Sequence, residues 1–550
     1  MADPGTQQTF KQVQTESEPH LLDLHSKGYI EGLCITDKRS GTKACYYYGG
    51  LPYALPPTGP FRWQRPRPLP PFHSYGTKTH PGRFTGAANV CPQIGRGPPS
   101  PLFSEDCLQL NIWVPHGAPP TGGWPVYFFI HGGFLQFGDA NGAHPVALFT
   151  ETACRFVVVK PAYRLGVLGF LASREAAADP ANRDASVGNL GLWDVRAALE
   201  WTARHVGLFG GDAANITVGG YSAGAHAAFH QLAYDIALPP AQRLVRRAVL
   251  QSNGPGPRPK ALAEAQLHFD ELLHRLGVAQ ALSPAEKMAA LRGTSWQTLL
   301  SAVERMNLHQ FRSISDGAFV RAGLFADLAS GAFAARLAAA DASVLVGECG
   351  AEWHNYGTWR PPPPGLHNLL RRFEADYARR VVDVVRRAYF PQGTLPPRFR
   401  DWGHAFGAVY ADLQVHASER GLVDALARHG AAHLVQRYRI EYRVGVADTK
   451  TPLEWGATHA ADMFLWWFGD GYVLEPEEKK AIREGLLDGF AKFVGGGDPG
   501  WGVKAPMECK RLKADGSVDI WRDDWWDEKI SVWNELMKVM VDESGLKPRL

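Results

Sequence analysis

Short apolar runs alternate with glycine turns and helical segments through the middle of the chain. The runs are short and bounded by turn residues, as buried strands are, and they cover residues 108–114, 126–130, 156–160, 216–218, 248–251 and 343–346. Residues 192–205 and 225–234 have the spacing or composition of helices. Strands that alternate with helices favour a mostly parallel central sheet flanked by helices on both faces. The pattern therefore predicts an α/β fold.

Two longer Ala/Leu-rich stretches, about 261–340 and 366–434, also have helical character. No Gly/Ser-type linker borders either stretch, so we expect helical insertions over the sheet and its active site rather than separate domains. The polar residues 1–21 are expected to form a flexible N-terminal arm. Residues 22–550 are then a single domain.

Composition excludes several classes of protein. The net charge of +3 is small for 550 residues, and no basic block of the kind that binds nucleic acid is present. No apolar run approaches the ~20 residues of a membrane span. The absence of an apolar leader predicts a cytoplasmic protein, with a secreted protein whose signal was removed as the alternative. Seven scattered cysteines lack metal-site spacing, so neither a metal nor another cofactor is expected.

The strongest local motif is Gly220-Tyr221-Ser222-Ala223-Gly224. It follows a predicted strand and precedes a predicted helix, which is the context of a nucleophile elbow. Its glycines suit a tight turn with no room for side chains. The motif therefore predicts Ser222 as a nucleophile.

A serine nucleophile needs a base and an acid that orients the base. In this fold type the chain order is serine, acid, histidine. His459, in a turn of small residues far downstream, is the candidate base, whereas His226 lies on the helix after Ser222 and is expected to pack. The strand at 343–346 leads to both Glu348 and Glu352. Local reasoning leaves the choice between these two glutamates open.

An oxyanion also needs hydrogen-bond donors. The turn His131-Gly132-Gly133 follows a predicted strand well before Ser222. We expect the oxyanion hole to consist of backbone N–H groups from Gly132, Gly133, Phe134 and Ala223, the residue after the nucleophile.

At this point the chain resembles the type-B carboxylesterases, which include cholinesterases, liver carboxylesterases and fungal lipases. Residues 209–224 are similar to the serine signature of that family, and 105–111, 163–170 and 188–194 match further family segments. The resemblance implies an α/β-hydrolase fold. It selects Glu352 over Glu348, because Gly347 precedes Glu352 at the family's spacing, and it supports His459. It also implies a Cys91–Cys107 disulfide, which conflicts with a cytoplasmic location.

Departures from the family pattern point to the substrate pocket. Phe134 replaces a third glycine in the oxyanion turn, Tyr221 stands where cholinesterases carry a glutamate, and Trp353 follows the candidate acid. With Leu135, these residues predict a pocket for a bulky or apolar small-molecule ester and argue against choline esters.

The expected function is carboxylic-ester hydrolysis by a Ser-His-Glu triad through an acyl-enzyme. An acyltransferase of secondary metabolism on the same triad is the alternative, and a non-catalytic, neuroligin-like binding protein is a third reading. The natural ester and the oligomeric state do not follow from the sequence.

Overall fold

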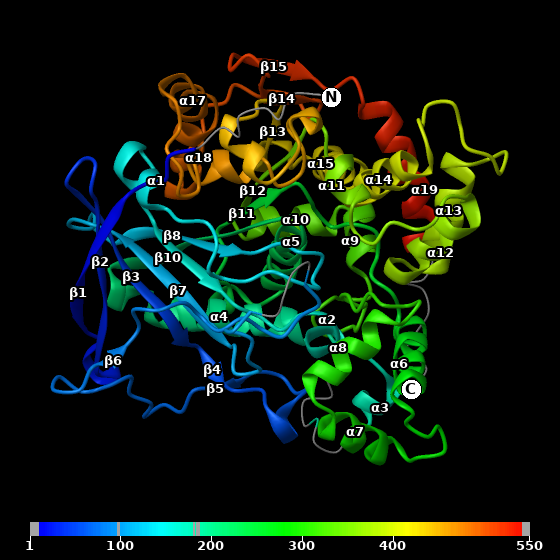
Figure 1. Ribbon diagram of the computed structural model, residues 1–550. Coiled ribbons are helices and arrows are strands. Elements are labelled where there is room, and N and C mark those ends of the chain that lie inside the picture. Colours follow the sequence, from blue (N-terminus) through cyan, green and yellow to red (C-terminus); the bar gives the residue numbers. More distant parts are fainter. Residues whose placement is uncertain (1–9, 96–99, 180–181, 183–186, 542–550) are drawn as a thin grey trace, which may run out of the picture.

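The computed structural model describes residues 10–95, 100–179, 182 and 187–541, and one large mixed sheet organises them (Figure 1). In sheet order the strands are β1 (Thr15–Asp23), β2 (Tyr29–Asp37), β3 (Thr42–Pro52), β7 (Gln109–Pro115), β9 (Val157–Pro161), β8 (Trp124–Ile130), β10 (Gly211–Tyr221), β11 (Arg247–Gln251), β12 (Ser343–Cys349), β13 (Val435–Ile440), β14 (Glu508–Leu512) and β15 (Val518–Arg522). The short β6 (Gly82–Arg83) pairs with β2, and β4 (Ala54–Leu55) with β5 (Arg67–Pro68) forms a separate ribbon.

The centre of the sheet is parallel, from β9 through β8 and β10 to β14, whereas the pairs at both margins are antiparallel. The carboxyl ends of parallel strands meet at one edge of a sheet, where α/β proteins bind ligands. The predicted mostly parallel α/β fold is therefore confirmed, and the six predicted strands lie within or largely overlap β7, β8, β9, β10, β11 and β12.

Successive side chains of each central strand pack on opposite faces of the sheet, so the core has two layers. On β8, Phe128 packs into one hydrophobic cluster and Tyr127 and Phe129 into the other. On β12, Val344 and Leu345 divide in the same way. Side chains of a strand point alternately to the two faces, so these strands are apolar throughout because helices cover both faces.

The helices are distributed unequally over the two faces (Figure 1). One face is covered by α1 (Val146–Glu151), α16 (Met463–Trp466), α17 (Pro476–Ile482) and α18 (Asp488–Gly495). The larger cluster on the other face takes side chains from α2 (Gly166–Phe170), α3 (Arg174–Ala177), α4 (Leu190–His205), α5 (Ala223–Asp235), α6 (Leu262–Leu276), α7 (Pro284–Gly293), α8 (Trp296–Glu304), α9 (Leu324–Ser330), α10 (Ala332–Ala339), α11 (Trp353–Gly357), α12 (Leu366–Asp376), α13 (Arg379–Tyr389), α14 (Trp402–Ala411), α15 (Ala417–Arg428) and α19 (Trp526–Val541). The two Ala/Leu-rich stretches supply α6–α10 and α12–α15.

The sequence predicted a flexible arm over residues 1–21, and the structure corrects this for the residues of the arm that it describes, 10–21. Thr15–Asp23 forms β1, the edge strand of the sheet, paired antiparallel with β2. Residues 1–9 of that arm lie outside the described residues. The strand escaped prediction because most of its side chains are exposed, and an edge strand without a buried face has no apolar alternation. Pro19, which cannot donate to a ladder, is tolerated at such an edge.

The structure joins Cys91 and Cys107 in a disulfide that closes a loop across a sequence separation of 16 residues. The other five cysteines are buried and free. Closing a loop of this length stabilises a fold by about 3 kcal/mol, chiefly by restricting the unfolded chain.

The double variant Cys91→Ser/Cys107→Ser is therefore expected to lose about 3 kcal/mol of unfolding free energy. Denaturant unfolding of the variant and the oxidised wild type measures the difference. The single variant Cys34→Ser, which removes a free thiol, is the control. Equal midpoints for the double variant and the wild type would show that the bond does not stabilise the fold.

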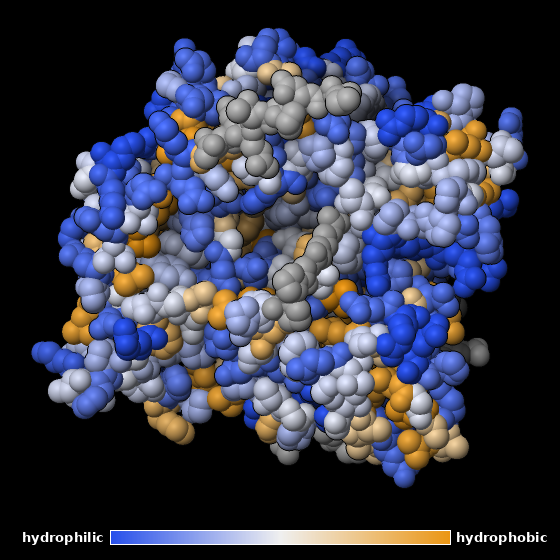
Figure 2. Space-filling model, in the orientation of Figure 1, coloured by the Kyte–Doolittle hydropathy of each residue, from blue (hydrophilic) through white to orange (hydrophobic). Residues whose placement is uncertain are grey.

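The surface seen in Figure 2 is largely hydrophilic, with apolar residues in small patches. Large exposed apolar side chains are few among the described residues, and most, such as Phe72 and Leu453, are far apart in sequence, while Val518 and Ile520 share one face of β15. No helix in the described ranges is long and apolar enough to cross a membrane.

Candidate active site

Ser222 lies at the sharp junction between β10 and α5. Its backbone has φ 58° and ψ −125°, a conformation that residues other than glycine rarely adopt. The Ser222 N–H donates to Gln251 O on the neighbouring strand, at 2.8 Å, and this bond fixes the strained turn. The serine is 3% exposed and borders a cavity. The structure therefore has the strained strand–serine–helix turn that the motif predicts.

The glycines of this motif are required by close backbone contacts. A Cβ on Gly224 would lie 2.0 Å from Ile130 O, and one on Gly220 would lie 2.4 Å from the Gly224 backbone. Both distances are far below van der Waals contact, so neither position accepts a side chain. The start of α5 can therefore approach β8, which leads into the oxyanion turn.

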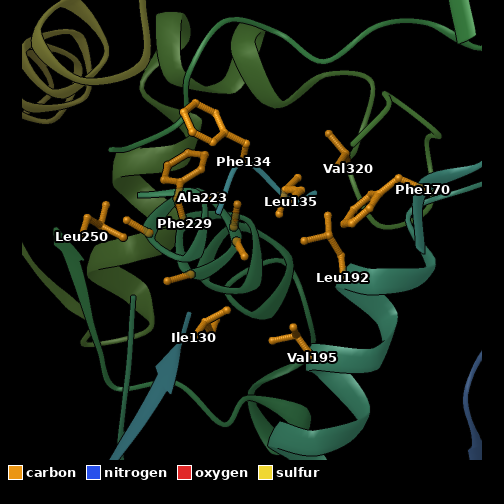
Figure 3. Close-up of a cluster of buried hydrophobic side chains, with 14 of the residues drawn as sticks. Ile130, Phe134, Leu135, Phe170, Leu192, Val195, Ala223, Phe229, Leu250 and Val320 are labelled. Carbon is orange, nitrogen blue, oxygen red and sulfur yellow. The ribbon is translucent and has the colours of Figure 1, made fainter. Parts of the chain in front are cut away.

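The apolar packing beneath the turn is visible in Figure 3. Ala223, Phe229, Ile130 and Leu250 are buried side chains of the larger core cluster, from α5, β8 and β11. Ser222 thus stands on a closely packed part of the core, which holds its position.

Glu352 and His459 come from two loops that the backbone holds together. The Ala351 N–H donates to Ala457 O at 3.0 Å, and the Thr458 hydroxyl donates to Ala351 O at 2.8 Å. The Glu352 Oε2 atom lies 2.5 Å from His459 Nδ1, while Oε1 accepts the N–H of Cys349 at 2.7 Å. Both side chains are buried. The carboxylate is thus positioned to orient the imidazole.

The free nitrogen of that imidazole is directed to the same site. His459 Nε2 is buried and has no hydrogen-bond partner among the described groups. His459 and Ser222 line one cavity, and the His459 ring centroid is 5.0 Å from that of Tyr221, the residue before the serine. The structure thereby brings the three predicted triad residues to one region.

Glu348, the competing candidate, is held elsewhere. Its carboxylate contacts Arg420 at 2.8 Å, Arg439 at 2.6 Å and His416 at 2.6 Å. Burial alone would raise the pKa of Glu348, but Arg420 and His416 hold it well below its ordinary value of 4.5. Since the folded-state pKa is depressed, the ionised carboxylate contributes stability above about pH 4.5 that is lost on acidification. Glu348 is therefore part of a buried ion-pair network.

The turn predicted to form the oxyanion hole follows β8. Gly133 has φ +109°, and a Cβ there would lie 1.9 Å from Phe137 O. The N–H groups of Gly133 and Phe134 donate no backbone bond within the described part of the chain. The Phe134 ring stacks on Trp359, with centroids 5.0 Å apart. The N–H groups of this turn are therefore available to an oxyanion beside Ser222.

The cavity has a volume of about 360 Å³, near the lower end for ligand pockets. Aromatic and sulfur-containing side chains line it together with charged ones: Phe129, Phe134, Phe137, Tyr221 and Met463, and Asp139, Lys160, Lys450 and Asp470. The prediction of a pocket for a bulky or apolar ester is thus incomplete, because charged side chains also line the cavity.

Two predicted pocket residues lie outside that lining. Leu135 is fully buried in the larger core cluster, among the side chains of Figure 3. Trp353 stacks on His354 and lies against His404, with centroids 3.5 and 4.4 Å away. Its position on α11 directs its ring toward α14. Of the substrate-pocket predictions, Tyr221 borders the cavity, whereas Leu135 and Trp353 are corrected.

Lys160 is a lining residue that the sequence analysis did not identify. Its ammonium group donates to Gly142 O at 2.6 Å and lies 4.1 Å from the Trp467 ring centroid. Burial lowers the pKa of Lys160 to about 7. The sequence did offer a signal for this residue, because Lys160 is a charged residue at the end of an otherwise apolar strand. In the described residues, no group of three or more His, Cys, Asp or Glu side chains could hold a metal ion.

A buried serine on a strand–helix elbow, at the carboxyl edge of a parallel sheet and beside a glutamate-oriented histidine, defines the α/β-hydrolase class. The structure of EstA from Aspergillus niger has the same fold, with a TM-score of 0.74 and 22% identity, over 95% of this chain and 99% of that one. Residues 18–508 match the model of the carboxylesterase family, and the chain belongs to that family.

Similar proteins extend over nearly the whole chain. A carboxylic ester hydrolase of Gibberella moniliformis is 43% identical, over 94% of this chain and 96% of that protein. An uncharacterised esterase/lipase of Schizosaccharomyces pombe is 34% identical, over 94% and 96%. The chain is accordingly a carboxylesterase-type serine hydrolase that acts on small-molecule carboxylic esters.

Proposed function

We propose that Ser222, His459 and Glu352 hydrolyse the ester in two steps. His459 Nε2 takes the Ser222 proton as Oγ attacks the carbonyl carbon, and then gives it to the leaving alcohol. Water attacks the acyl-enzyme carbonyl carbon and its proton goes to His459, which passes this proton to Ser222 Oγ as the C–Oγ bond breaks. Glu352 keeps the imidazole in position and stabilises its cationic form. The observation that carries the proposal is the 2.5 Å contact of Glu352 with a histidine that shares a cavity with Ser222.

The proposed oxyanion donors are the backbone N–H groups of the turn after β8, principally Gly133 and Phe134, together with Ala223. Preorganised donors of this kind stabilise the charge that develops on the carbonyl oxygen. Because a backbone N–H does not depend on the side chain, Phe134 can serve where related proteins carry glycine. Gly132 then serves mainly to let the turn approach Tyr221, whose O atom lies 2.7 Å from a Cβ placed there.

The cavity supports a proposal for the substrate class. Its modest volume and aromatic lining favour esters with a short or medium acyl chain or an aromatic group. We expect p-nitrophenyl esters from acetyl to octanoyl to be hydrolysed, and palmitoyl esters to be poor substrates. Initial rates across the series, at equal enzyme concentration, measure this preference. A rate that rises steadily to palmitoyl would contradict the proposed pocket size.

Acyl transfer is the alternative chemistry of the same triad. Product analysis with a competing alcohol or amine separates the two activities: a hydrolase releases mainly the free acid, and an acyltransferase mainly the new ester or amide. Labelling of Ser222 by a fluorophosphonate distinguishes both from a binding protein without an active triad.

A further inference from the structure

The short helix α11 carries a second polar group to the reaction centre. Glu352 caps the start of α11, and Tyr356 follows it four residues later. Residues four apart share one face of a helix, so the same face that directs Glu352 to His459 also directs Tyr356 there. The Tyr356 and His459 ring centroids are 4.6 Å apart.

The Tyr356 side chain is fixed and fully buried. Its exposed fraction is 1%, and its ring packs against Phe134 and Tyr410, with centroids 5.7 and 5.2 Å away. Yet its hydroxyl oxygen is buried without a well-formed hydrogen bond to any group in the described part of the chain. A buried hydroxyl without a partner is unfavourable, which suggests a role at the site.

One group that interacts with this hydroxyl is the side chain of Ser222. Burial raises the pKa of Tyr356 well above its ordinary value, Glu352 and Tyr410 raise it further, and interaction with the Ser222 hydroxyl opposes the rise. The phenol therefore stays protonated at neutral pH and is available as a donor. Among the described residues, both this hydroxyl and His459 Nε2 lack a well-oriented hydrogen-bond partner, and His459 lines the same cavity as Ser222.

We propose that the Tyr356 hydroxyl donates a hydrogen bond to Ser222 Oγ and stabilises this oxygen as it leaves the acyl group. This inference rests on the proposed acyl-enzyme mechanism. In the deacylation step, the C–Oγ bond breaks, its electron pair passes to Oγ, and the proton on His459 Nε2 moves to Oγ. Tyr356 keeps its own proton throughout and contributes only the hydrogen bond.

The donor affects the two halves of the reaction unequally. In the free enzyme, Ser222 is a neutral hydroxyl, which accepts a hydrogen bond better than an ester oxygen does, so part of the proposed interaction is available before acylation. In the acyl-enzyme, Oγ is an ester oxygen and a poor acceptor, and it becomes a strong acceptor only as negative charge returns to it. Only interactions that strengthen in the transition state accelerate a step. Tyr356 therefore accelerates deacylation more than acylation.

The test is Tyr356→Phe with p-nitrophenyl acetate, for which acylation is fast because the leaving group is good. We expect kcat to fall about tenfold, equivalent to about 1.4 kcal/mol of activation free energy. We expect kcat/KM to change by less than about threefold, so that KM falls as well. Stopped-flow kinetics should show a p-nitrophenolate burst of nearly one equivalent of Ser222. Equal losses in kcat and kcat/KM, or an unchanged kcat, would overturn the proposal.

Tyr410→Phe is the matched control, since its ring contacts Tyr356 but its hydroxyl donates to Asp376 at 2.9 Å. It should lose stability and retain the kcat of each folded molecule. Tyr356→Phe should be at least as stable as the wild type, because it removes an unpartnered hydroxyl. If that variant does not fold, 3,5-difluorotyrosine at position 356 keeps the ring and strengthens the donor; a lowered kcat then contradicts the proposal. A wild type that forms no acyl-enzyme refutes both this role and the proposed function.

Discussion

Replacing Ser222 by alanine is expected to lower kcat for p-nitrophenyl acetate by about 10⁵-fold or more, as in other serine hydrolases. Without Oγ no acyl-enzyme can form, and only the oxyanion donors and substrate binding remain. The fold should survive, because the Ser222 side chain makes no capping bond to α5. Initial rates measure the loss, and fluorophosphonate labelling should disappear with them.

Ser313→Ala is the control for this experiment. Ser313 is a buried serine whose hydroxyl lies 3.1 Å from Nε2 of His226, and it has no place in the proposed mechanism. It should keep the rate and the labelling of the wild type. A Ser222→Ala variant that hydrolyses the ester at the wild-type rate would exclude Ser222 as the nucleophile.

The elements that carry the chemistry were predictable because each is specified locally. Buried strands such as β8 and β12 are apolar on both faces, and the elbow at Ser222 needs glycines on either side. Such signals require no knowledge of distant parts of the chain. The edge strand β1 lacks them, because its side chains face solvent, and it was predicted as an arm.

The sequence could not predict which side chains from distant loops come together at the site. Leu135 follows the predicted oxyanion turn and Trp353 follows Glu352 in sequence, yet the Leu135 side chain is buried in the core and the Trp353 ring points toward α14. Lys160 and Tyr356 reach the site from β9 and α11. The direction of a side chain in a turn or helix depends on backbone geometry, and in a helix one residue of offset rotates it by about 100°. Function in this fold is therefore better predicted for the nucleophile than for the pocket.

The two glutamates that local sequence reasoning could not separate should fail in different ways. In Glu352→Gln, the amide can present an N–H to His459 Nδ1, which favours the tautomer with its proton on Nε2. That nitrogen then cannot accept the Ser222 proton, and we expect kcat to fall by about 10³- to 10⁴-fold. Stability should change little in comparison, because the glutamine keeps an oxygen acceptor for the Cys349 N–H.

Glu348→Gln should show the opposite behaviour. It leaves the buried Arg420 and Arg439 without their shared carboxylate, and breaking a buried ion pair costs about 3–5 kcal/mol of unfolding free energy. Each folded molecule should nevertheless turn over at nearly the wild-type rate, since His459 keeps its partner. Denaturant unfolding measures the first quantity, and kcat divided by the sites titrated with fluorophosphonate measures the second. If Glu348→Gln lost activity per titrated site while Glu352→Gln kept it, the two carboxylates would have to exchange roles, and the orientation of His459 would need a different explanation.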